Sequence, residues 1–279
     1  MKFALSTNWC NQRIESGADI VRKAAELGFD ALELGFNTTA GQAKEIRASL
    51  DVLPVGSVHA FCPVPISAPQ GHPELYQLAS PDADAAALAA AHVRRNIEFA
   101  ASVGADALVL HAGRVMCRGW LRSRDMRRRV KRGARLLPAF RRVLDSIVPV
   151  LEQNGVRLGL ENLPYLEGFP AEWEMAEVAG EWVRPWFDIG HDYVRRQKGW
   201  LEASAQSPQI PILGLHVNDS NGGDDHLPPG EGKVDFAAFA ALAARTPHLV
   251  LEPNPDTTDD ALKNGLSYLK NIWSDHEQT

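Results

Sequence analysis

Short apolar runs alternate with longer segments of helical periodicity along the whole chain. The runs are apolar on both faces, as strands buried in a parallel sheet are, and each has the length of a strand. The eight runs are KFALST (2–7), DALELGF (30–36), VLPVGSVHAF (52–61), DALVLHA (106–112), VRLGLEN (156–162), VRPWFDI (183–189), PILGLHV (211–217) and HLVLEP (248–253). This alternation predicts β-α-β units from end to end.

The intervals between the runs carry helical patterns, most clearly at 17–28, 85–104, 237–245 and 259–273. Two of these patterns end at Gly28 and Gly104, where a left-handed C-cap would precede the next strand. Eight such units predict an α/β protein, a single (β/α)8 TIM barrel that forms one domain over residues 1–279. The competing architecture is an open doubly wound sheet, which normally has a glycine-rich phosphate turn after its first strand; STNWCNQR has none.

Two predicted loops are long for a compact domain, and long loops are usually lids or binding loops. Residues 62–81 hold five prolines, which predicts an extended loop with no helix. Residues 218–233 are rich in glycine, proline and aspartate, contain His226, and follow the seventh strand. We expect the second loop to lie across the end of the barrel, with Asp224, Asp225 and His226 within reach of a ligand.

Composition narrows the class of protein. The chain of 279 residues is 45% hydrophobic, enough for a large core, and no window approaches the roughly 18 apolar residues that cross a bilayer. The beginning of the chain lacks the apolar run of a secretory signal. Cys10, Cys62 and Cys117 are far apart and form no CxxC, which argues against a disulfide scaffold or a zinc ribbon. We therefore expect a cytoplasmic protein without a membrane partner.

Charge is unevenly distributed. The net charge is −6, yet residues 114–142 hold twelve lysines and arginines against one acid, Asp125. Such a segment can attract phosphate or nucleic acid. It can equally be a solvated helix face, and it lacks the interleaved aromatic residues that stack on single-stranded bases.

Polar residues recur where the predicted strands end. TIM-barrel active sites lie at this C-terminal mouth, so these side chains should meet there. The residues at or just after strand ends are His59, His111, Glu161, Asn162, Asp188, His191, His216, His226 and Glu252. Burying so many imidazoles and carboxylates without compensation would cost several kcal/mol per charge, and a bound divalent cation removes that cost. A set of oxygen and nitrogen ligands without thiolate suits Mn, Mg, Co, Fe or Zn.

These residues lie in motifs that resemble the xylose-isomerase-like TIM barrel superfamily, in particular its sugar (phosphate) isomerase/epimerase branch. The motifs are SVHAF, LVLHAGR, LGLEN, FDIGHDY, LHVNDSNGGDDHLPPGEGKVDF and LVLEPNP, in that order along nearly the whole chain. The resemblance implies one divalent metal ion held by Glu161, Asp188, His216 and Glu252. It also implies that Glu161 and Glu252 form the catalytic acid/base pair.

By the same resemblance, His59, His111, His191 and His226 bind the substrate, a small sugar, ketose or sugar phosphate. A glutamate would remove the proton beside a carbonyl group, and the metal would stabilise the resulting enediolate. A homo-oligomer is consistent with related barrels, with exposed apolar parts of Trp200 or Trp273 as contacts.

A second class stays open, because the superfamily includes the type IV apurinic endonucleases, which act on DNA. Their site of two or three zinc ions uses further ligands, for which His59, His111, His191, Asp224 and His226 are candidates. Overall acidity and few available aromatic residues argue against a nucleic-acid partner. A dehydratase or lyase on the same scaffold is a third option, since a fold does not fix a reaction.

The pocket walls are expected to come from loops at the mouth. Trp9, Phe61 and Trp120 would either stack on a sugar face or pack in the core. Arg114 or Arg118 would either bind a substrate phosphate or face solvent.

Overall fold

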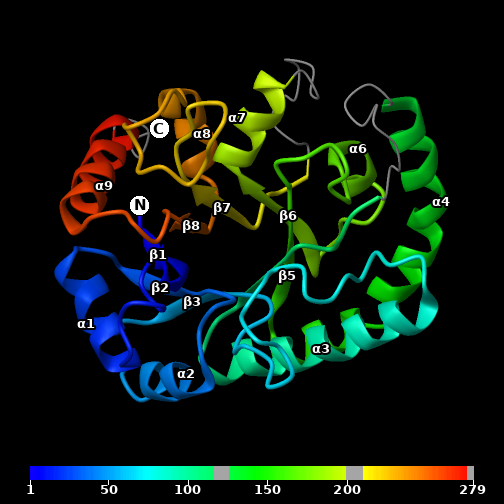
Figure 1. Cartoon of the computed structure of the whole chain (residues 1–279), viewed down its shortest axis with the longest axis horizontal. Coiled ribbons are helices and arrows are strands. Elements are labelled where there is room, and N and C mark those ends of the chain that lie inside the picture. Colours follow the sequence, from blue (N-terminus) through cyan, green and yellow to red (C-terminus); the bar gives the residue numbers. More distant parts are fainter. Residues whose placement is uncertain (116–125, 199–209, 275–279) are drawn as a thin grey trace.

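Eight parallel strands form a closed barrel in the computed structural model, which describes residues 1–115, 126–198 and 210–274 (Figure 1). The strands are β1 (Ala4–Ser6), β2 (Ala31–Leu34), β3 (Val55–His59), β4 (Ala107–Leu110), β5 (Arg157–Glu161), β6 (Val183–Asp188), β7 (Gly214–Val217) and β8 (His248–Leu251). They follow sequence order around the barrel, and β1 pairs with both β2 and β8. The predicted (β/α)8 barrel is confirmed, and the open sheet is excluded.

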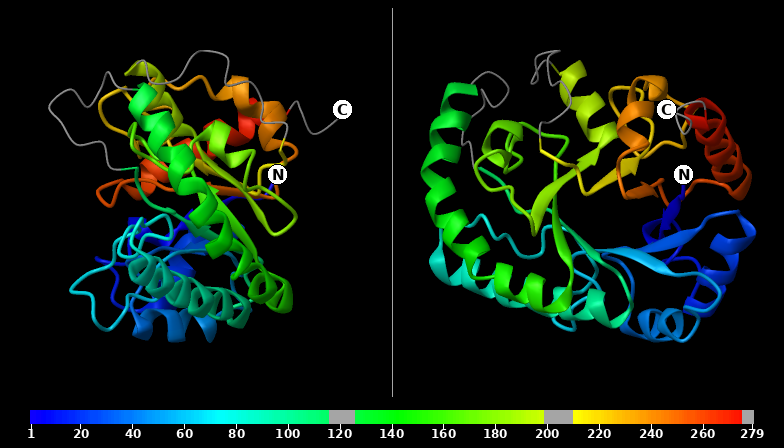
Figure 2. Two further views of the ribbon diagram at one scale, coloured as in Figure 1. Left: turned by 90° about the vertical axis from the view of Figure 1, so that its right-hand side faces the viewer. Right: turned by 180° about the vertical axis from the view of Figure 1, so that it is seen from behind.

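Every strand lies within its predicted run but is shorter than that run. After β1, for example, the chain turns at once into the 3₁₀ helix η1 (Thr7–Trp9), so the predicted strand loses its last residue. The other helical elements are α1 (Gly17–Glu26), α2 (Ala40–Arg47), α3 (Ala83–Ser102), α4 (Met126–Asp145), α5 (Val148–Asn154), α6 (Glu172–Met175), α7 (Ile189–Gln197), η2 (Phe236–Phe239), α8 (Ala240–Ala243) and α9 (Asp259–Trp273). The longer helices surround the ring of strands (Figures 1 and 2).

Helix boundaries follow local sequence. The Asp82 side chain accepts a hydrogen bond from the amide of Ala85 and begins α3, and the Ser16 hydroxyl does the same for α1. Gly28 and Gly104, just beyond the ends of these helices, have φ angles of +88° and +78°. The left-handed conformation predicted for both glycines is therefore confirmed, and it returns the chain toward the next strand.

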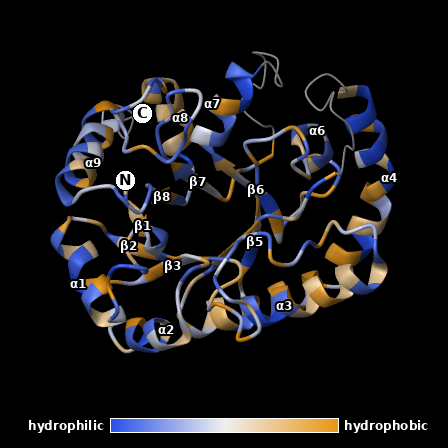
Figure 3. Cartoon of the chain, in the orientation of Figure 1, coloured by the Kyte–Doolittle hydropathy of each residue, from blue (hydrophilic) through white to orange (hydrophobic). Residues whose placement is uncertain are grey.

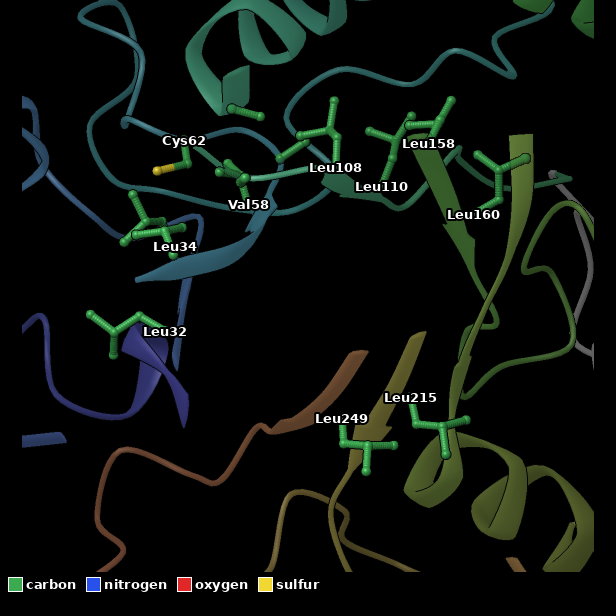
Figure 4. Packing of buried hydrophobic residues seen from close by; sticks show 14 of the residues in the cluster. Leu32, Leu34, Val58, Cys62, Leu108, Leu110, Leu158, Leu160, Leu215 and Leu249 are labelled. Carbon is green, nitrogen blue, oxygen red and sulfur yellow. The ribbon is translucent and has the colours of Figure 1, made fainter. Parts of the chain in front are cut away.

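Side chains along each strand point alternately outward and inward, which divides the core into two layers. Side chains such as Leu32, Leu158, Leu215 and Leu249 lie on the outer side of the ring of strands, where the helices pack against them (Figure 4). A smaller apolar cluster belongs to the inner face and includes Ala4, Ala107, Val109, Trp186 and Val250. The residues next to the outward leucines point into the barrel, which places the polar groups of the strand ends at its mouth.

Helix α4 carries most of the described part of the basic segment. Hydrophilic residues gather on its N-terminal half (Figure 3), and Arg127, Lys131 and Arg135 are exposed. Arg129 is the exception, because it is fully buried and its guanidinium binds both carboxylate oxygens of Glu174 at 2.7 and 2.8 Å. One member of the segment thus ties α4 to α6, while others form a solvated face.

Residues 62–81 form a loop that contains no helix, as their prolines predict. Trp273 is buried and stacks on Phe3 with ring centroids 5.9 Å apart, so the expectation that it offers an exposed oligomer contact is wrong; Trp200 lies outside the described residues.

In the described part of the chain, no helix has the length and apolarity to cross a membrane. The single-domain organisation and the cytoplasmic location stay predictions.

Candidate active site

The structure brings Glu161, Asp188, His216 and Glu252 together at the mouth of the barrel. Glu161 and Asp188 end β5 and β6, His216 lies in β7, and Glu252 follows β8 directly. Each offers one ligand atom, and these four atoms lie within 4.8 Å of one another. All four residues are at most 5% exposed. Side chains that are up to 91 positions apart in the sequence therefore form one buried cluster, which we call the four-residue cluster.

His216 lies at the centre of this cluster. Its Nδ1 atom is 3.1 Å from Glu161 Oε1, 3.2 Å from Glu252 Oε2 and 3.8 Å from Asp188 Oδ2. Pairing of β6 with β7 sets Asp188 directly beside His216, which fixes part of this geometry through the sheet. The ring also packs edge-on against Trp186, 5.3 Å away, which fills the barrel.

Amide side chains orient the carboxylates of the cluster. Asn8 Nδ2 donates to Glu252 Oε1 at 3.1 Å, and Asn218 Nδ2 donates to Asp188 Oδ2 at 2.8 Å. The other Asp188 oxygen accepts from the amide of His191 at 2.7 Å, so this carboxylate also caps helix α7. Each of these carboxylates keeps free lone pairs toward the shared centre.

Glu161 lies between this centre and a second group that contains His59 and His111. Its Oε2 atom is 3.1 Å from the Nε2 atoms of both histidines. His59 Nδ1 is 3.0 Å from the carbonyl oxygen of Ala60, which indicates that Nδ1–H donates and that Nε2 faces the carboxylate. The His59, His111 and Glu161 ligand atoms also lie within 4.8 Å of one another.

A third group contains Asp188, His191 and His226, again with ligand atoms within 4.8 Å. His191 Nδ1 lies 2.8 Å from the carbonyl oxygen of Asn162, and His226 Nδ1 lies 2.8 Å from that of Glu252. Donation from Nδ1 to a carbonyl leaves Nε2 as the free ligand atom of each ring. All four histidines predicted to bind substrate thus lie around the four-residue cluster and line one cavity with Glu161 and Glu252.

Burial and charge act in opposite directions on the pKa values of these groups. Burial alone would raise the pKa of Glu161, but the neighbouring His216 and His111 hold it well below its usual range. Burial would lower the pKa of His216, but the carboxylates of Glu252, Glu161 and Glu33 raise it well above its usual value. Asp188 differs, because burial dominates and raises its pKa. The site therefore concentrates negative charge around one imidazole in a place that water hardly reaches.

The loop at 218–233 lies at the mouth, as predicted, and a buried carboxylate organises it. Asp219 Oδ1 accepts from the amides of Ser220 and Val234 at 2.8 and 3.0 Å, and Oδ2 accepts from those of Gly230 and Gly232, both at 2.9 Å. These four bonds fold the loop back on itself. Asp219 is not among the predicted site residues, because its role depends on contacts that no motif spacing reveals.

Within this loop, His226 takes a φ angle of +58°, in the left-handed region. Its amide donates to Asn218 Oδ1 at 3.0 Å, and its ring faces the site. Asp225 Oδ2 is 3.8 Å from His191 Nε2. Asp224 is exposed and its carboxylate accepts from Asn221 at 3.2 Å, so the expectation that Asp224 reaches a ligand at the mouth is wrong.

The walls of the cavity differ from the expected ones. Trp9 and Phe61 are buried and pack in the core, where Trp9 donates to the carbonyl oxygen of Thr257 at 2.7 Å. Neither lines the cavity, whose apolar wall includes Phe36 and Pro73. Trp120 lies outside the described residues.

Arg114, one of the two arginines for which phosphate binding and solvent exposure were left open, is paired with other side chains. The Arg114 Nε–H group donates to both carboxylate oxygens of Glu74, at 2.9 and 2.8 Å, and its guanidinium lies 3.9 Å from the Tyr165 ring centroid. Arg114 therefore fastens the 62–81 loop to the rim. Arg118 and Cys117 lie outside the described residues, and Cys10 and Cys62 are free, buried cysteines.

Glu33 is the site residue that sequence reasoning missed. It lies inside β2, is fully buried, and its Oε1 and Oε2 atoms are 3.2 and 3.3 Å from His216 Nε2. Glu33 is the third residue of a four-residue strand, so it is not among the polar residues at the strand ends that predicted the site. The sequence did contain a signal for a functional role of Glu33, because an acidic residue stands between two leucines in a run predicted to be buried.

The donor set of the four-residue cluster fits a divalent cation. Three carboxylates and one imidazole are ligands of first-row divalent metals and magnesium. Ligands that bind one ion at about 2.0–2.2 Å stand at most about 4.4 Å apart, so atoms within 4.8 Å need little movement. The cluster can therefore hold a metal ion, because its negatively charged carboxylates attract a cation.

The fold and this cluster define a (β/α)8 barrel with a group of possible metal ligands at its mouth. A family comparison matches residues 21–272 with the xylose isomerase-like TIM barrel family, and the chain belongs to that family. The family resemblance inferred from the motifs is confirmed. Over 100 residues the chain is also 31% identical to the uncharacterized protein MJ1311 of Methanocaldococcus jannaschii, but the match spans only 33% of this chain and 34% of that protein.

Solved structures share the fold over their full length. A D-tagatose 3-epimerase-like protein superposes with a TM-score of 0.73 and 24% identity over 99% of each chain. The 3-keto-D-glucoside 4-epimerase YcjR of E. coli gives 0.69 and 17% over 97% of this chain and 99% of that one. The IOLI protein with a bound zinc atom gives 0.67 and 12% over the whole of both chains. At these identities the similarities establish the fold.

Proposed function

We propose that this protein is a divalent-metal-dependent isomerase or epimerase of a sugar, ketose or sugar phosphate. The observation that carries the proposal is the pairing of Glu161 and Glu252. Glu161 ends β5 and Glu252 follows β8; both approach the same His216 nitrogen, at 3.1 and 3.2 Å, and both line the cavity. In the proposed complex a substrate carbon lies in that cavity between the two carboxylates, as proton exchange between two faces requires.

In the proposed reaction, different residues transfer the proton, hold the metal ion and orient a catalytic glutamate. One glutamate accepts the proton from the carbon beside the carbonyl group, and the other returns a proton, to the opposite face for epimerisation. A cation held by Glu161, Asp188, His216 and Glu252 would act as a Lewis acid and withdraw negative charge from the carbonyl oxygen. Asn8 orients Glu252 through the bond from its amide, so that one oxygen stays directed at the cavity.

Substrate hydroxyl groups have partners nearby. His191 and His226 each present Nε2 to the mouth with Nδ1 engaged by a carbonyl, and His59 and His111 face the cavity from the other side. Phe36 and Pro73 supply an apolar wall, which suits a carbon-bearing face of a sugar ring. Two of the similar structures support a sugar substrate, since one is a D-tagatose 3-epimerase-like protein and the other a 3-keto-D-glucoside 4-epimerase.

Deuterium wash-in tests the proposal. The protein is incubated in D₂O with Mn²⁺ and a panel of ketoses, aldoses and their phosphates, and each sugar is analysed for deuterium at single carbons. We expect incorporation into one sugar class and its stereoisomer. Glu161→Gln should abolish the exchange, because an amide accepts no proton at neutral pH. Exchange that persisted undiminished in Glu161→Gln, with exposed Glu98→Gln as the matched control, would contradict the assignment of Glu161.

A multi-zinc phosphodiesterase resembling the type IV apurinic endonucleases is a second candidate. Two further ligand groups favour it, one at His59, His111 and Glu161 and one at Asp188, His191 and His226. In the latter, both histidines have Nδ1 fixed by carbonyl groups, an arrangement that metal-binding histidines commonly show.

Metal content and a nuclease assay separate the two candidates. One tightly held ion per chain supports the isomerase or epimerase, and two or three zinc ions support the phosphodiesterase. Incision of a duplex that contains an abasic site, abolished by a chelator, would establish the second candidate in place of the first.

A further inference from the structure

We propose that Glu33 is a positioning residue that fixes the tautomer of His216 and raises its affinity for a cation. The inference rests on the metal site of the proposed function and adds a residue that does not belong to the four-residue cluster. Glu33 does not line the cavity, so it acts through His216 and not on the substrate.

Glu33 reaches His216 across the interior of the barrel. It lies in β2, opposite Ser57 of β3, where the register of the two strands shifts between Leu32 and Glu33. Ser57 Oγ donates to Glu33 Oε2 at 2.9 Å, and His216 Nε2 lies 3.2 Å from Oε1. All three residues are 0% exposed, so water does not compete for these bonds.

Both ring nitrogens of His216 face carboxylates, which only accept hydrogen bonds, so without a cation a hydrogen on either nitrogen finds an acceptor. A cation at the shared centre requires a lone pair on Nδ1, because Nδ1 faces Glu161, Glu252 and Asp188. The hydrogen of the neutral ring is then on Nε2, where Glu33 accepts it. A lone pair among carboxylate oxygens is repulsive unless a cation lies between them. Glu33 thus directs the ligand atom of His216 toward the shared centre.

The charge of Glu33 is also stabilised by this arrangement. A buried carboxylate is costly without donors, and the ion pairs of the described residues join Glu33 only to His216. A carboxylate that accepts from a metal-binding imidazole makes the ring a stronger ligand, and removing such a partner typically costs about 10–100-fold in metal affinity. A purely structural role in the barrel core would leave metal affinity unchanged.

The experiment compares Zn²⁺ affinity in four proteins by competition with a chromophoric chelator. These are the wild type, Glu33→Gln, Ser57→Ala and the control Ser6→Ala. Ser6 is paired with Glu33 in the neighbouring strand, is equally buried, and its hydroxyl has no partner. We expect Glu33→Gln to bind Zn²⁺ about 10–100-fold more weakly, Ser57→Ala to lose less, and Ser6→Ala to match the wild type. Thermal unfolding of each variant checks its folding.

¹⁵N NMR of the histidine rings gives a readout independent of stability. In the zinc-loaded wild type, His216 should carry hydrogen on Nε2 and bind the metal through Nδ1. If Glu33→Gln does not fold, this spectrum and Ser57→Ala still decide the question. The inference is overturned if Glu33→Gln binds Zn²⁺ within twofold of the wild type or if His216 binds through Nε2. A wild type that binds no divalent ion would instead overturn the proposed function.

Discussion

The hydrogen bonds of Asp219 lead to a sharp prediction about the loop at 218–233. Each carboxylate oxygen accepts from two backbone amides, with all four distances between 2.8 and 3.0 Å. In Asp219→Asn, which has almost the same shape, an NH₂ group replaces one of the two oxygens. In either orientation of the side-chain amide, its NH₂ group faces two backbone N–H groups and cannot accept hydrogen bonds from them.

The magnitude follows from the number of bonds lost. A hydrogen bond to a charged group contributes about 1.5–3 kcal/mol, so the loss of two lowers the free energy of unfolding by about 3–6 kcal/mol if the loop stays folded. At roughly 2 °C per kcal/mol for a domain of this size, the unfolding temperature falls by about 6–12 °C. If the loop opens locally instead, the global loss is smaller and the amides of Gly230, Gly232 and Val234 lose their protection from hydrogen exchange.

Thermal unfolding and hydrogen exchange measure both outcomes. Asp224→Asn is the matched control in the same loop, because Asp224 is exposed and its change should stay within about 0.5 kcal/mol. His226 should also be displaced in Asp219→Asn, since the loop sets its position. An Asp219→Asn protein with the wild-type unfolding temperature and fully protected loop amides would refute the reasoning.

Two further predictions concern the core. In Gly214→Ala the new Cβ would lie 2.3 Å from the Trp186 ring, so we expect denaturant unfolding to show a free energy of unfolding lower by at least about 1–3 kcal/mol. Gly180 has open space around it, so Gly180→Ala should lower the free energy of unfolding far less. Equal decreases in the two variants would contradict the packing described. Burial raises the pKa of the Cys10 thiol to about 12, so the thiolate is about 10⁻⁴ of the total at pH 8. Peptide mapping after iodoacetamide treatment should find Cys10 unmodified in the native protein and modified in urea; rapid native labelling would show that it is accessible.

The fold was predictable because buried parallel strands have an unambiguous pattern. Each of the eight strands lies within an apolar run bounded by polar residues, and glycines such as Gly28 end helices where the chain must turn. The convergence of Glu161, Asp188, His216 and Glu252 was predictable for the same reason. Once the strands are placed in a barrel, the residues at their C-terminal ends share one mouth.

Details that depend on side-chain direction were not predictable. Asp224 and Asp225 are adjacent acids in a glycine-rich loop, and the bonds from Asn221 to Asp224 and the left-handed backbone of His226 decide which carboxylate approaches the site. Trp9 follows a strand end, as a sugar-stacking residue would, yet its indole N–H is satisfied in the core by Thr257. Tertiary contacts of this kind leave no periodic pattern in a single sequence.

The proposed function depends on one divalent cation that binds among Glu161, Asp188, His216 and Glu252. Crystals grown with Mn²⁺ would reveal such an ion in an anomalous difference map. We expect a peak within about 2.0–2.4 Å of one atom from each of the four side chains, with His216 contributing Nδ1. A map without a peak in this cluster, at Mn²⁺ concentrations that saturate the protein in solution, would contradict this expectation.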